Sequence, residues 1–567
     1  MAWIMDGKYR PLPILGRFEK RLDTGPQDWK QYSASLLIFN SVLFVFGYIV
    51  LSLQPWMPLN PEGKTLLSPT TIFHSVASFM TNTDLQHYSG EVSLSNFSQI
   101  FFCIANLFLS AAIGLSALTA IIRAFRSDPS LGNFFVDMWR VVVYLFIPAA
   151  FIFSIIFMQQ GSPMTFDSSI QVSTLEPQAK PQTIALGPVA AFESMKMLGT
   201  NGGGFFGTNS AHPYENPTDI SNFFNTLAMM LFPFSLVLMY GRMLNRRGHS
   251  FVIFCVMLLL MASTIIWTIS FDTLHPNPAL TQHKARTYKI DGKAFDLPAV
   301  ERLPVDQHLG NLEGKELRFG ISAGATFAAL TTNVTCGAVN AEADSLNPLA
   351  GLAPMVGMWL NCIFGGKGVG MINMLLYIII GIFIAGMMVG RSPEYLGKKI
   401  GAREVKLAII ALLVHPMMIL MPAGLFAATQ YGMEAISNPG AHGFSQILYQ
   451  FSSASANNGS AFDGLNVTYG FYNNPNPAPE AIAWDIATGL VMIFSRFLPI
   501  IAPIAMAASL GAKRTCAFGL GTLPDDTPTF GCLLLGTILI VGALLFFPVA
   551  TLGPVAEHLG PIPFGQS

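Results

Sequence analysis

Four short polar clusters contain the residues whose types and spacing could do chemistry. They read Ser78-Phe-Met-Thr-Asn-Thr-Asp84, Leu198-Gly-Thr-Asn-Gly-Gly-Gly204, Thr331-Thr-Asn-Val-Thr-Cys-Gly337 and Ser455-Ala-Asn-Asn-Gly-Ser460. Their shared three-residue cores are Asn82-Thr83-Asp84, Thr200-Asn201-Gly202, Thr335-Cys336-Gly337 and Asn457-Asn458-Gly459. Rings of backbone carbonyls with Thr and Asn oxygens can replace the water shell of a monovalent cation. One such cluster would be an ordinary turn, but four in register favour an ion filter.

The elements that position these clusters must be membrane helices. The chain has 567 residues, of which 52% are hydrophobic and 11% charged, where soluble domains average roughly 25% charged residues. The net charge of -1 gives no indication of nucleic-acid binding. Apolar runs long enough to cross ~30 Å of hydrocarbon predict nine membrane units, near residues 34–53, 98–122, 137–158, 219–241, 250–270, 348–390, 404–428, 482–509 and 529–552.

The basic residues predict the orientation of the chain, because Lys and Arg in short loops stay in the cytoplasm. They follow alternate spans, as at Arg123, Arg242, Lys398 and Lys513. Residues 1–33 are basic and lack an apolar signal region, so we expect a cytoplasmic leader. Nine crossings then place the C-terminal tail, 553–567, outside. All four polar clusters fall in loops that face outward.

The near-regular spacing of the clusters predicts four repeated units. Each unit has a span, a short re-entrant helix that ends in a cluster, and a second span. The units cover residues 34–122, 137–241, 250–390 and 404–509, and 529–552 is a final helix. The predicted fold class is an all-α polytopic membrane protein with four pseudo-repeated units around a central pore.

Two intramembrane charges are candidate gate residues. Phe364-Gly-Gly-Lys-Gly-Val-Gly370 interrupts the sixth membrane unit, and the helix is expected to break there. Lys367, between Gly366 and Gly368, is either part of an internal gate or a residue that snorkels at a helix end. Arg496 in the eighth span is a functional candidate by default, and a structural salt bridge is the alternative.

The sequence contains no Asp-Lys-Thr-Gly phosphorylation motif, no HExxH and no GxSxG. Gly63-Lys64-Thr65 resembles the end of a P-loop, but the preceding glycine of that motif is absent. His415 lies in an apolar run and is expected to be a packing histidine. We therefore expect no catalytic residue and no cofactor in this chain.

Several blocks of the sequence resemble the potassium-binding A subunits (KdpA) of Kdp-type potassium-transporting ATPases of bacteria. These blocks are SFMTNTDLQHYSG from Ser78, KMLGTNGGGFFGTNSAHPYENP from Lys196, GMMVGRSPEYLGKKI from Gly386, HGFSQILYQFSSASANNGSAF from His442 and LGPVAEHL from Leu552. The resemblance covers the chain from about residue 28 to its end. It implies a channel-like fold of the potassium-transporter superfamily in the bacterial inner membrane.

The resemblance also implies a function and partners. Potassium would be selected from outside and passed through an intramembrane tunnel to a P-type catalytic subunit, KdpB. A single-span subunit, KdpC, would complete the complex, and a small peptide subunit and membrane lipid are further expected partners. The family's filter positions fall on Asn82, Thr200, Thr335 and Asn457, and Gln86 matches a further residue tied to potassium affinity. ATP would be used by the partner.

This chain departs from the family pattern at three points. The family usually begins with one more membrane helix, and either an alternative start codon or a true loss would explain the difference. Asp84 stands where Asn is expected, and Asn361 where an acidic residue is expected. These two positions alter the charge balance along the expected ion path.

A stand-alone potassium channel or ion-coupled transporter of the same fold is the alternative function, and a structural membrane scaffold is a third.

Overall fold

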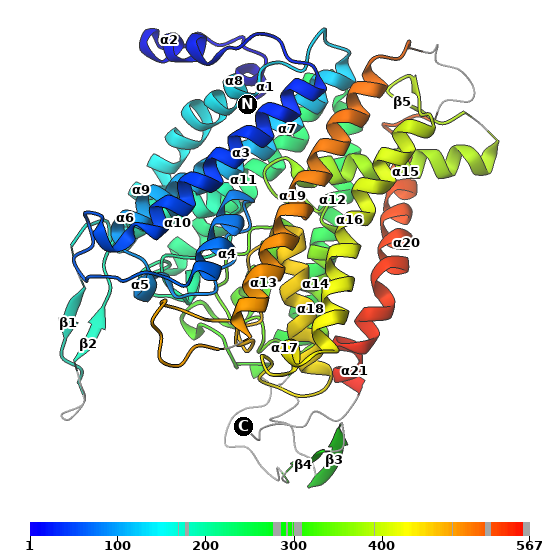
Figure 1. The fold of residues 1–567 in the computed structure, drawn as a ribbon. Coiled ribbons are helices and arrows are strands. Elements are labelled where there is room, and N and C mark those ends of the chain that lie inside the picture. The colour runs from blue at the N-terminus through cyan, green and yellow to red at the C-terminus, as the bar shows by residue number, and fades with distance from the viewer. Residues whose placement is uncertain are drawn as a thin grey trace.

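The fold of the chain is a bundle of long membrane helices that surround shorter ones (Figure 1). The computed structural model describes all residues except 168, 176–180, 276–284, 291–292, 298, 300–308, 391, 479, 516–522 and 560–567. Arg391, inside one family block, and the end of the expected tail 553–567 therefore lie outside the described residues. The structure is 66% helical, and nine helices among the described residues are long and apolar enough to cross a membrane. The predicted fold class is confirmed.

The spans agree with the predicted apolar runs to within a few residues, except that only the second half of the sixth run, 348–390, forms a full span. They are α3 (Trp29–Ser52), α7 (Ala105–Arg126), α8 with α9 (Phe134–Val141 and Ile147–Gln160), α11 (Asp219–Met243), α12 (Arg247–Thr268), α15 (Val369–Val389), α16 (Ala402–Ala427), α19 (Ala481–Gly511) and α20 (Pro528–Leu552). Turns of π-helix, at Gln99–Ile104, Val142–Phe146 and Ile269–Thr273, continue three of these spans. At the start of α3, a capping box between Asp28 and Gln31 satisfies the first free N–H groups.

Each of the four units contains one short helix between its two spans. They are α4 (Pro69–Met80), α10 (Val189–Gly199), α13 (Ile321–Asn333) and α18 (Ala441–Ala456). With 11 to 16 residues each, they are shorter than the ~20 residues that a crossing requires. Each of these pore helices ends at one of the four polar clusters.

The third unit ends in two helices, as the glycine-rich interruption predicts. α14 (Pro348–Leu360) stops at Asn361, which adopts a left-handed conformation with φ +46°. The segment that contains Gly366 (φ +54°) and Gly368 (φ +95°) follows, and α15 begins at Val369. Glycine tolerates such positive φ values at little cost, so the membrane helix breaks here.

The remaining elements lie at the two ends of the bundle. Short helices are α1 (Ala2–Met5), α2 (Pro13–Leu22), α5 (Gly90–Ser93), α6 (Asn96–Ser98), α17 (Gln430–Met433) and α21 (Pro554–Leu559), with 3₁₀ turns at Gln54–Trp56, Asn209–Ala211 and Leu317–Phe319. Three antiparallel hairpins pair β1 (Ile170–Val172) with β2 (Gln182–Ile184), β3 (Arg286–Ile290) with β4 (Lys293–Leu297), and β5 (Glu394–Tyr395) with β6 (Lys398–Lys399). α1, α2 and β5 lie at one end, which we call the leader side, and α21 and the other two hairpins lie at the opposite end (Figure 1).

Candidate ion-binding site

All four pore helices end in the same backbone conformation. The residue that starts each predicted core is left-handed: Asn82 has φ +63°, Thr200 +45°, Thr335 +46° and Asn457 +52°. This conformation is uncommon outside glycine and is unfavourable for a β-branched threonine. Strained backbone of this kind persists where the surroundings fix it, and it concentrates at functional sites. We call the four segments that start at these residues, 82–84, 200–202, 335–337 and 457–459, the filter loops.

The first and second filter loops are joined by three hydrogen bonds. Asn82 Nδ2 donates to the Thr200 carbonyl oxygen at 3.0 Å, and the Gly202 amide donates to the Thr83 carbonyl oxygen at 3.2 Å. Asn201 Nδ2 donates to Asp84 Oδ2 at 2.7 Å. The predicted site residues of these two loops therefore lie together.

The other neighbouring loops are also in contact, so the four loops form a closed ring. Cys336 Sγ donates to the Asn201 carbonyl oxygen at 3.4 Å, which joins loops two and three. Asn458 Nδ2 donates to the Thr331 carbonyl oxygen at 3.3 Å, next to loop three. Asn457 Nδ2 donates to Thr83 Oγ1 at 3.0 Å and closes the ring between loops four and one.

Glycine is required at several points of the ring, and Gly202 and Gly337 show why. A Cβ added at Gly202 would stand 2.6 Å from both the Thr83 carbonyl oxygen and the Cα of Gly459. A Cβ added at Gly337 would stand 2.0 Å from the Asn458 carbonyl oxygen. Any side chain at either position would displace backbone atoms of the neighbouring loops.

Gln86 supports the outer part of the second loop. Its Oε1 accepts from the Gly204 amide at 2.9 Å, and its Nε2 donates to the Gly204 carbonyl oxygen at 3.1 Å. This paired contact fixes the backbone two residues beyond Gly202.

Asp84 is enclosed by the protein. The residue is fully buried, and its Oδ1 has no hydrogen-bond partner among the described residues. Nearby, Ser110 Oγ donates to Asn82 Oδ1 at 3.2 Å, and the Ser110 carbonyl oxygen accepts from Arg496 Nη2 at 3.1 Å. Ser110 was not predicted, because a serine inside an apolar span carries no distinguishing sequence signal. Arg496 also interacts electrostatically with the fully buried Asp84, so a structural charge pair stays the alternative to a functional role.

The helix break lies directly against the third filter loop. The Gly366 amide donates to the Val334 carbonyl oxygen at 2.7 Å, and a Cβ at Gly366 would stand 3.2 Å from Thr335 Oγ1. Lys367 is 1% exposed, and its Nζ lies 5.2 Å from the centroid of the Phe232 ring. In the described part of the chain, this ammonium has no hydrogen-bond partner. Such burial does not support the snorkelling interpretation.

A buried ion cluster stands behind the second filter loop and was also not predicted. Lys196 Nζ lies 2.5 Å from Glu193 Oε2 and 2.6 Å from Glu215 Oε2, and it donates to Asn209 Oδ1 at 2.8 Å. Glu215 Oε1 accepts from the Phe206 amide at 2.8 Å. One sequence feature could have indicated this cluster: Glu193 and Lys196 are oppositely charged and lie three residues apart in a weakly apolar pore helix.

A pocket begins at the fourth filter loop and runs between the third and fourth units. Its cavity volume is about 30 Å³. Its lining includes Asn457 at one end, Asn361 at the helix break, and residues of α15, α16, α19 and α20. His415 borders it, with Nδ1 2.8 Å from Ser455 Oγ and Nε2 2.9 Å from the Met358 carbonyl oxygen. Both ring nitrogens of this histidine are therefore satisfied, as a packing histidine requires.

The fold and the ring of loops define a class of membrane protein built from four pore-helix units. The potassium transporter TrkH from Vibrio parahaemolyticus has a similar fold, with a TM-score of 0.50 at 10% sequence identity over 83% of this chain and 84% of that one. A family profile described as potassium-transporting ATPase A subunit, KdpA, matches residues 14–559. The chain therefore belongs to the KdpA family.

Two relatives show how extensive the similarity is. The chain is 44% identical over 532 residues to the potassium-transporting ATPase potassium-binding subunit of Geobacillus kaustophilus (strain HTA426), covering 94% of this chain and 89% of the relative. It is 42% identical over 533 residues to the protein of the same name from Delftia acidovorans (strain DSM 14801 / SPH-1), with the same coverage. The family resemblance of the sequence blocks is confirmed.

Proposed function

We propose that this chain is the potassium-binding and translocating subunit of an ATP-driven potassium uptake complex. The observation that carries the proposal is the convergence of four pore-helix C-termini on one ring. Each helix C-terminus carries roughly half a negative charge, so four of them favour a cation where the filter loops meet. The carbonyls and the Asn and Thr side chains of these loops supply the oxygen ligands that a dehydrated monovalent cation needs. The names of the relatives support potassium as that cation.

The transported ion leaves the ring through the protein rather than straight across the membrane. The pocket that begins at Asn457 and reaches Asn361 supports this route, because it opens a space between units three and four next to α20. Its Asn, Ser and His groups offer oxygen and nitrogen atoms to a partly hydrated ion. The pocket is the first part of a tunnel toward the catalytic partner.

Lys367 acts as the gate beneath the ring, in a break formed by Gly366 and Gly368. Its unpaired ammonium repels a cation that would continue along the pore axis. Arg496 and Asp84 set the charge balance on the opposite side of the ring. The break, the ring and the pocket together direct the ion sideways.

The chain works with partners that hydrolyse ATP. The word ATPase in the relatives' names supports a catalytic partner; we assign this role to a P-type subunit, KdpB, accompanied by KdpC and a small peptide subunit. The complex lies in the bacterial inner membrane. The N-terminus of this chain lies in the cytoplasm, and the filter loops open outward.

Co-expression of the chain with a KdpB and a KdpC subunit tests the proposal. The three should copurify, and ATP hydrolysis by the complex should be stimulated by potassium. A complex with Gly202→Ala should lose the stimulation and keep the copurification. If the chain purifies alone and conducts potassium in liposomes without ATP, it is a stand-alone channel and the proposal is wrong.

A further inference from the structure

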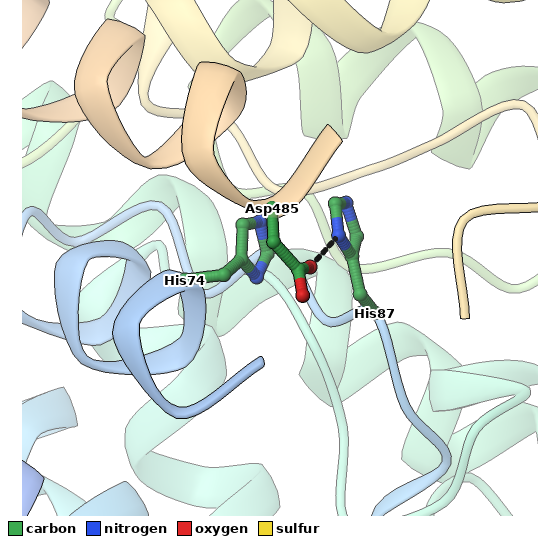
Figure 2. A group of neighbouring side chains, drawn as sticks. All are labelled: His74, His87 and Asp485. Carbon is green, nitrogen blue, oxygen red and sulfur yellow. Dashed lines mark hydrogen bonds and ion pairs between the residues drawn. The ribbon is translucent and has the colours of Figure 1, made fainter. Parts of the chain in front are cut away.

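A fully buried cluster beside the first filter loop joins the first and fourth units. Figure 2 shows His74 from α4, Asp485 from α19, and His87 from the segment that follows the loop. His87 Nδ1 and Asp485 Oδ1 are 2.7 Å apart, and the rings of His74 and His87 stack with their centroids 3.7 Å apart. An imidazole binds a metal in the plane of its ring, and these two nearly parallel planes do not meet at a common ion. The cluster therefore ties the two units together, and the surface that the proposed ion path leaves unexplained lies on the leader.

The leader helix α2 presents an apolar face that the described part of the chain leaves largely uncovered. Figure 1 shows α2 at the edge of the bundle on the leader side, where it projects past α8. Ile14, Phe18 and Leu22 recur every four residues and so share one face of the helix. Ile14 is 68% and Phe18 47% exposed, and none of the ten residues of α2 is buried. Because a helix this short is marginal in water by itself, we expect a partner to cover this face.

Basic residues lie beside this apolar face. Arg17 and Arg21 each follow an exposed apolar residue by three positions, which places them next to it on the helix surface. Both arginines are exposed, and Glu19, the acidic residue of α2, is already paired with Arg140 of α8 at 2.8 Å. Residues 8–23 carry five basic and two acidic side chains, so the surroundings of the apolar face are positive. A helix with an apolar face and a basic border is typical of helices that lie in the interface of a membrane.

The apolar face of α2 stands at the level of the membrane surface. The ring of Phe18 packs on that of Trp139, with the ring centroids 5.9 Å apart. Trp139 lies in α8, at the start of a membrane span that continues into α9, and tryptophan is enriched where a span enters the interface. Further along this span, Phe151 and Ile152 are 67% and 57% exposed, as lipid-facing residues are. Phe18 is therefore placed where lipids surround the span.

Both ends of the segment that carries α2 are fixed to the bundle. Before α2, the Met5 carbonyl oxygen accepts from Arg123 Nη2 at 2.7 Å. After α2, the Gln27 amide donates to the Gly132 carbonyl oxygen at 2.9 Å, and the Gln27 carbonyl oxygen accepts from the Leu131 amide at 3.0 Å. These contacts hold α2 in place, so the binding of a ligand requires little further ordering.

We propose that α2 is an interfacial anchor that binds anionic phospholipids of the leaflet on the leader side. Ile14 and Phe18 insert between the lipids, and Arg17 and Arg21 bind the phosphate groups of the lipid heads. Charge complementarity and the position of Phe18 beside the span favour a lipid surface over a protein as the occupant. A basic residue near an anionic membrane surface contributes about fivefold in affinity, so the two arginines together contribute more than about tenfold. The proposal does not depend on the function proposed for the ring.

The test is hydrogen–deuterium exchange of the purified full chain in lipid nanodiscs, measured by mass spectrometry for the backbone amides of α2. In nanodiscs of equal parts phosphatidylcholine and phosphatidylglycerol, these amides should exchange at least about tenfold more slowly than in phosphatidylcholine alone. High salt should reduce this difference, because it screens charges at the membrane surface.

Two double variants separate the basic border from the apolar face. In Arg17→Gln with Arg21→Gln, the difference between the two lipid compositions should disappear. Arg403→Gln with Lys406→Gln is the matched control, because both residues are exposed at the start of α16 and their loss removes the same charge away from α2; it should behave as the wild type. In Ile14→Ala with Phe18→Ala, the amides of α2 should exchange faster in both kinds of nanodisc, although alanine favours a helix at least as well.

Three results would overturn the proposal. The first is equal exchange of the wild-type α2 amides in the two lipid compositions. The second is slow exchange in anionic nanodiscs that persists in either double variant of α2. The third is fast exchange in both compositions that slows only when a catalytic partner subunit is added, which would assign the apolar face to a protein contact.

Discussion

Asn201 Nδ2 donates to Asp84 Oδ2 at 2.7 Å, so a carboxylate from the first filter loop is held by the second. The bond leaves Asp84 Oδ1 without a partner among the described residues, although the side chain is fully buried. A buried acceptor of this kind costs free energy unless something else binds it. Under the function proposed for the ring, the partner that fits is the transported ion.

Asp84→Asn should therefore weaken potassium binding. At ~4 Å and an effective dielectric constant near 20, a unit charge pair is worth up to about 4 kcal/mol, so a loss of 10- to 100-fold in affinity is expected. Because Asp84 is buried, salt should screen the effect only slightly. Potassium titration of the purified complex at low and high ionic strength checks this. Equal affinities for the variant and the wild type at low salt would leave Asp84 as an ordinary turn residue.

Gly202→Ala should lower potassium affinity at least tenfold and reduce the preference over sodium and rubidium. The added Cβ would stand 2.6 Å from backbone atoms of two other loops, so the ring must shift. Gly424→Ala is the matched control, because a Cβ there meets nothing within 4 Å. The rate of ATP hydrolysis by the complex is measured as a function of potassium, rubidium and sodium concentration. These curves give the apparent affinity and the ion preference of each variant. An unchanged ion ranking in Gly202→Ala would show that the ring does not select the ion.

Lys367→Met should stabilise the protein and open the path beneath the ring. An unpaired charge in the protein interior is expensive, and a methionine of similar length removes that cost. We expect a higher melting temperature and at least tenfold faster rubidium tracer flux through the complex in liposomes. A lower melting temperature would mean that the Lys367 ammonium has a stabilising partner, and unchanged flux would exclude Lys367 from the gate.

Cysteines introduced at Thr208 and Asn473 should react with a membrane-impermeant maleimide in whole cells. Both residues are exposed and lie in loops expected to face outward. Lys20→Cys, exposed on the leader side, should react only after lysis. Labelling is compared with the parent chain, which has its own cysteines. If Thr208→Cys or Asn473→Cys reacts only after lysis, the loop that contains it faces the cytoplasm and the expected orientation is wrong.

His442 should make stability depend on pH in the alkaline range. Burial alone would lower the pKa of His442, but its bonds to Asp344 at 3.1 Å and Glu557 at 2.7 Å outweigh this and raise the pKa to about 10. A raised folded pKa stabilises the fold fully below the unfolded value near 6.5, and this contribution disappears as the pH rises through 10. His442→Gln should therefore cost on the order of 2 kcal/mol at pH 6 and little at pH 10. Melting curves at both pH values test this; equal losses would exclude the ion contacts as the cause.

The sequence predicted the membrane elements well because hydropathy and length determine them. The break before α15 was predictable from Gly366 and Gly368, since glycine clusters disfavour a continuous helix. The register of the four clusters also identified the first residue of each core, and the structure shows that these residues are left-handed. Hydropathy could not find Ser110 or the bond between Asn201 and Asp84, because these contacts depend on how distant helices pack. His74 and Asp485 lie 411 positions apart in the sequence. No local sequence pattern could therefore show that they meet in the fold.

The ring closes between its first and last units, and this has a consequence for how the protein is made. Asp485 is synthesised 398 residues after His87. At about 5–20 residues per second, the ribosome needs roughly 20–80 s to supply the second partner. During that interval, the polar groups of the first unit are already in or near the lipid without the partners that will satisfy them. The insertion machinery, or a chaperone that acts beside it, must keep the polar groups of the first unit away from the lipid until α19 has been inserted.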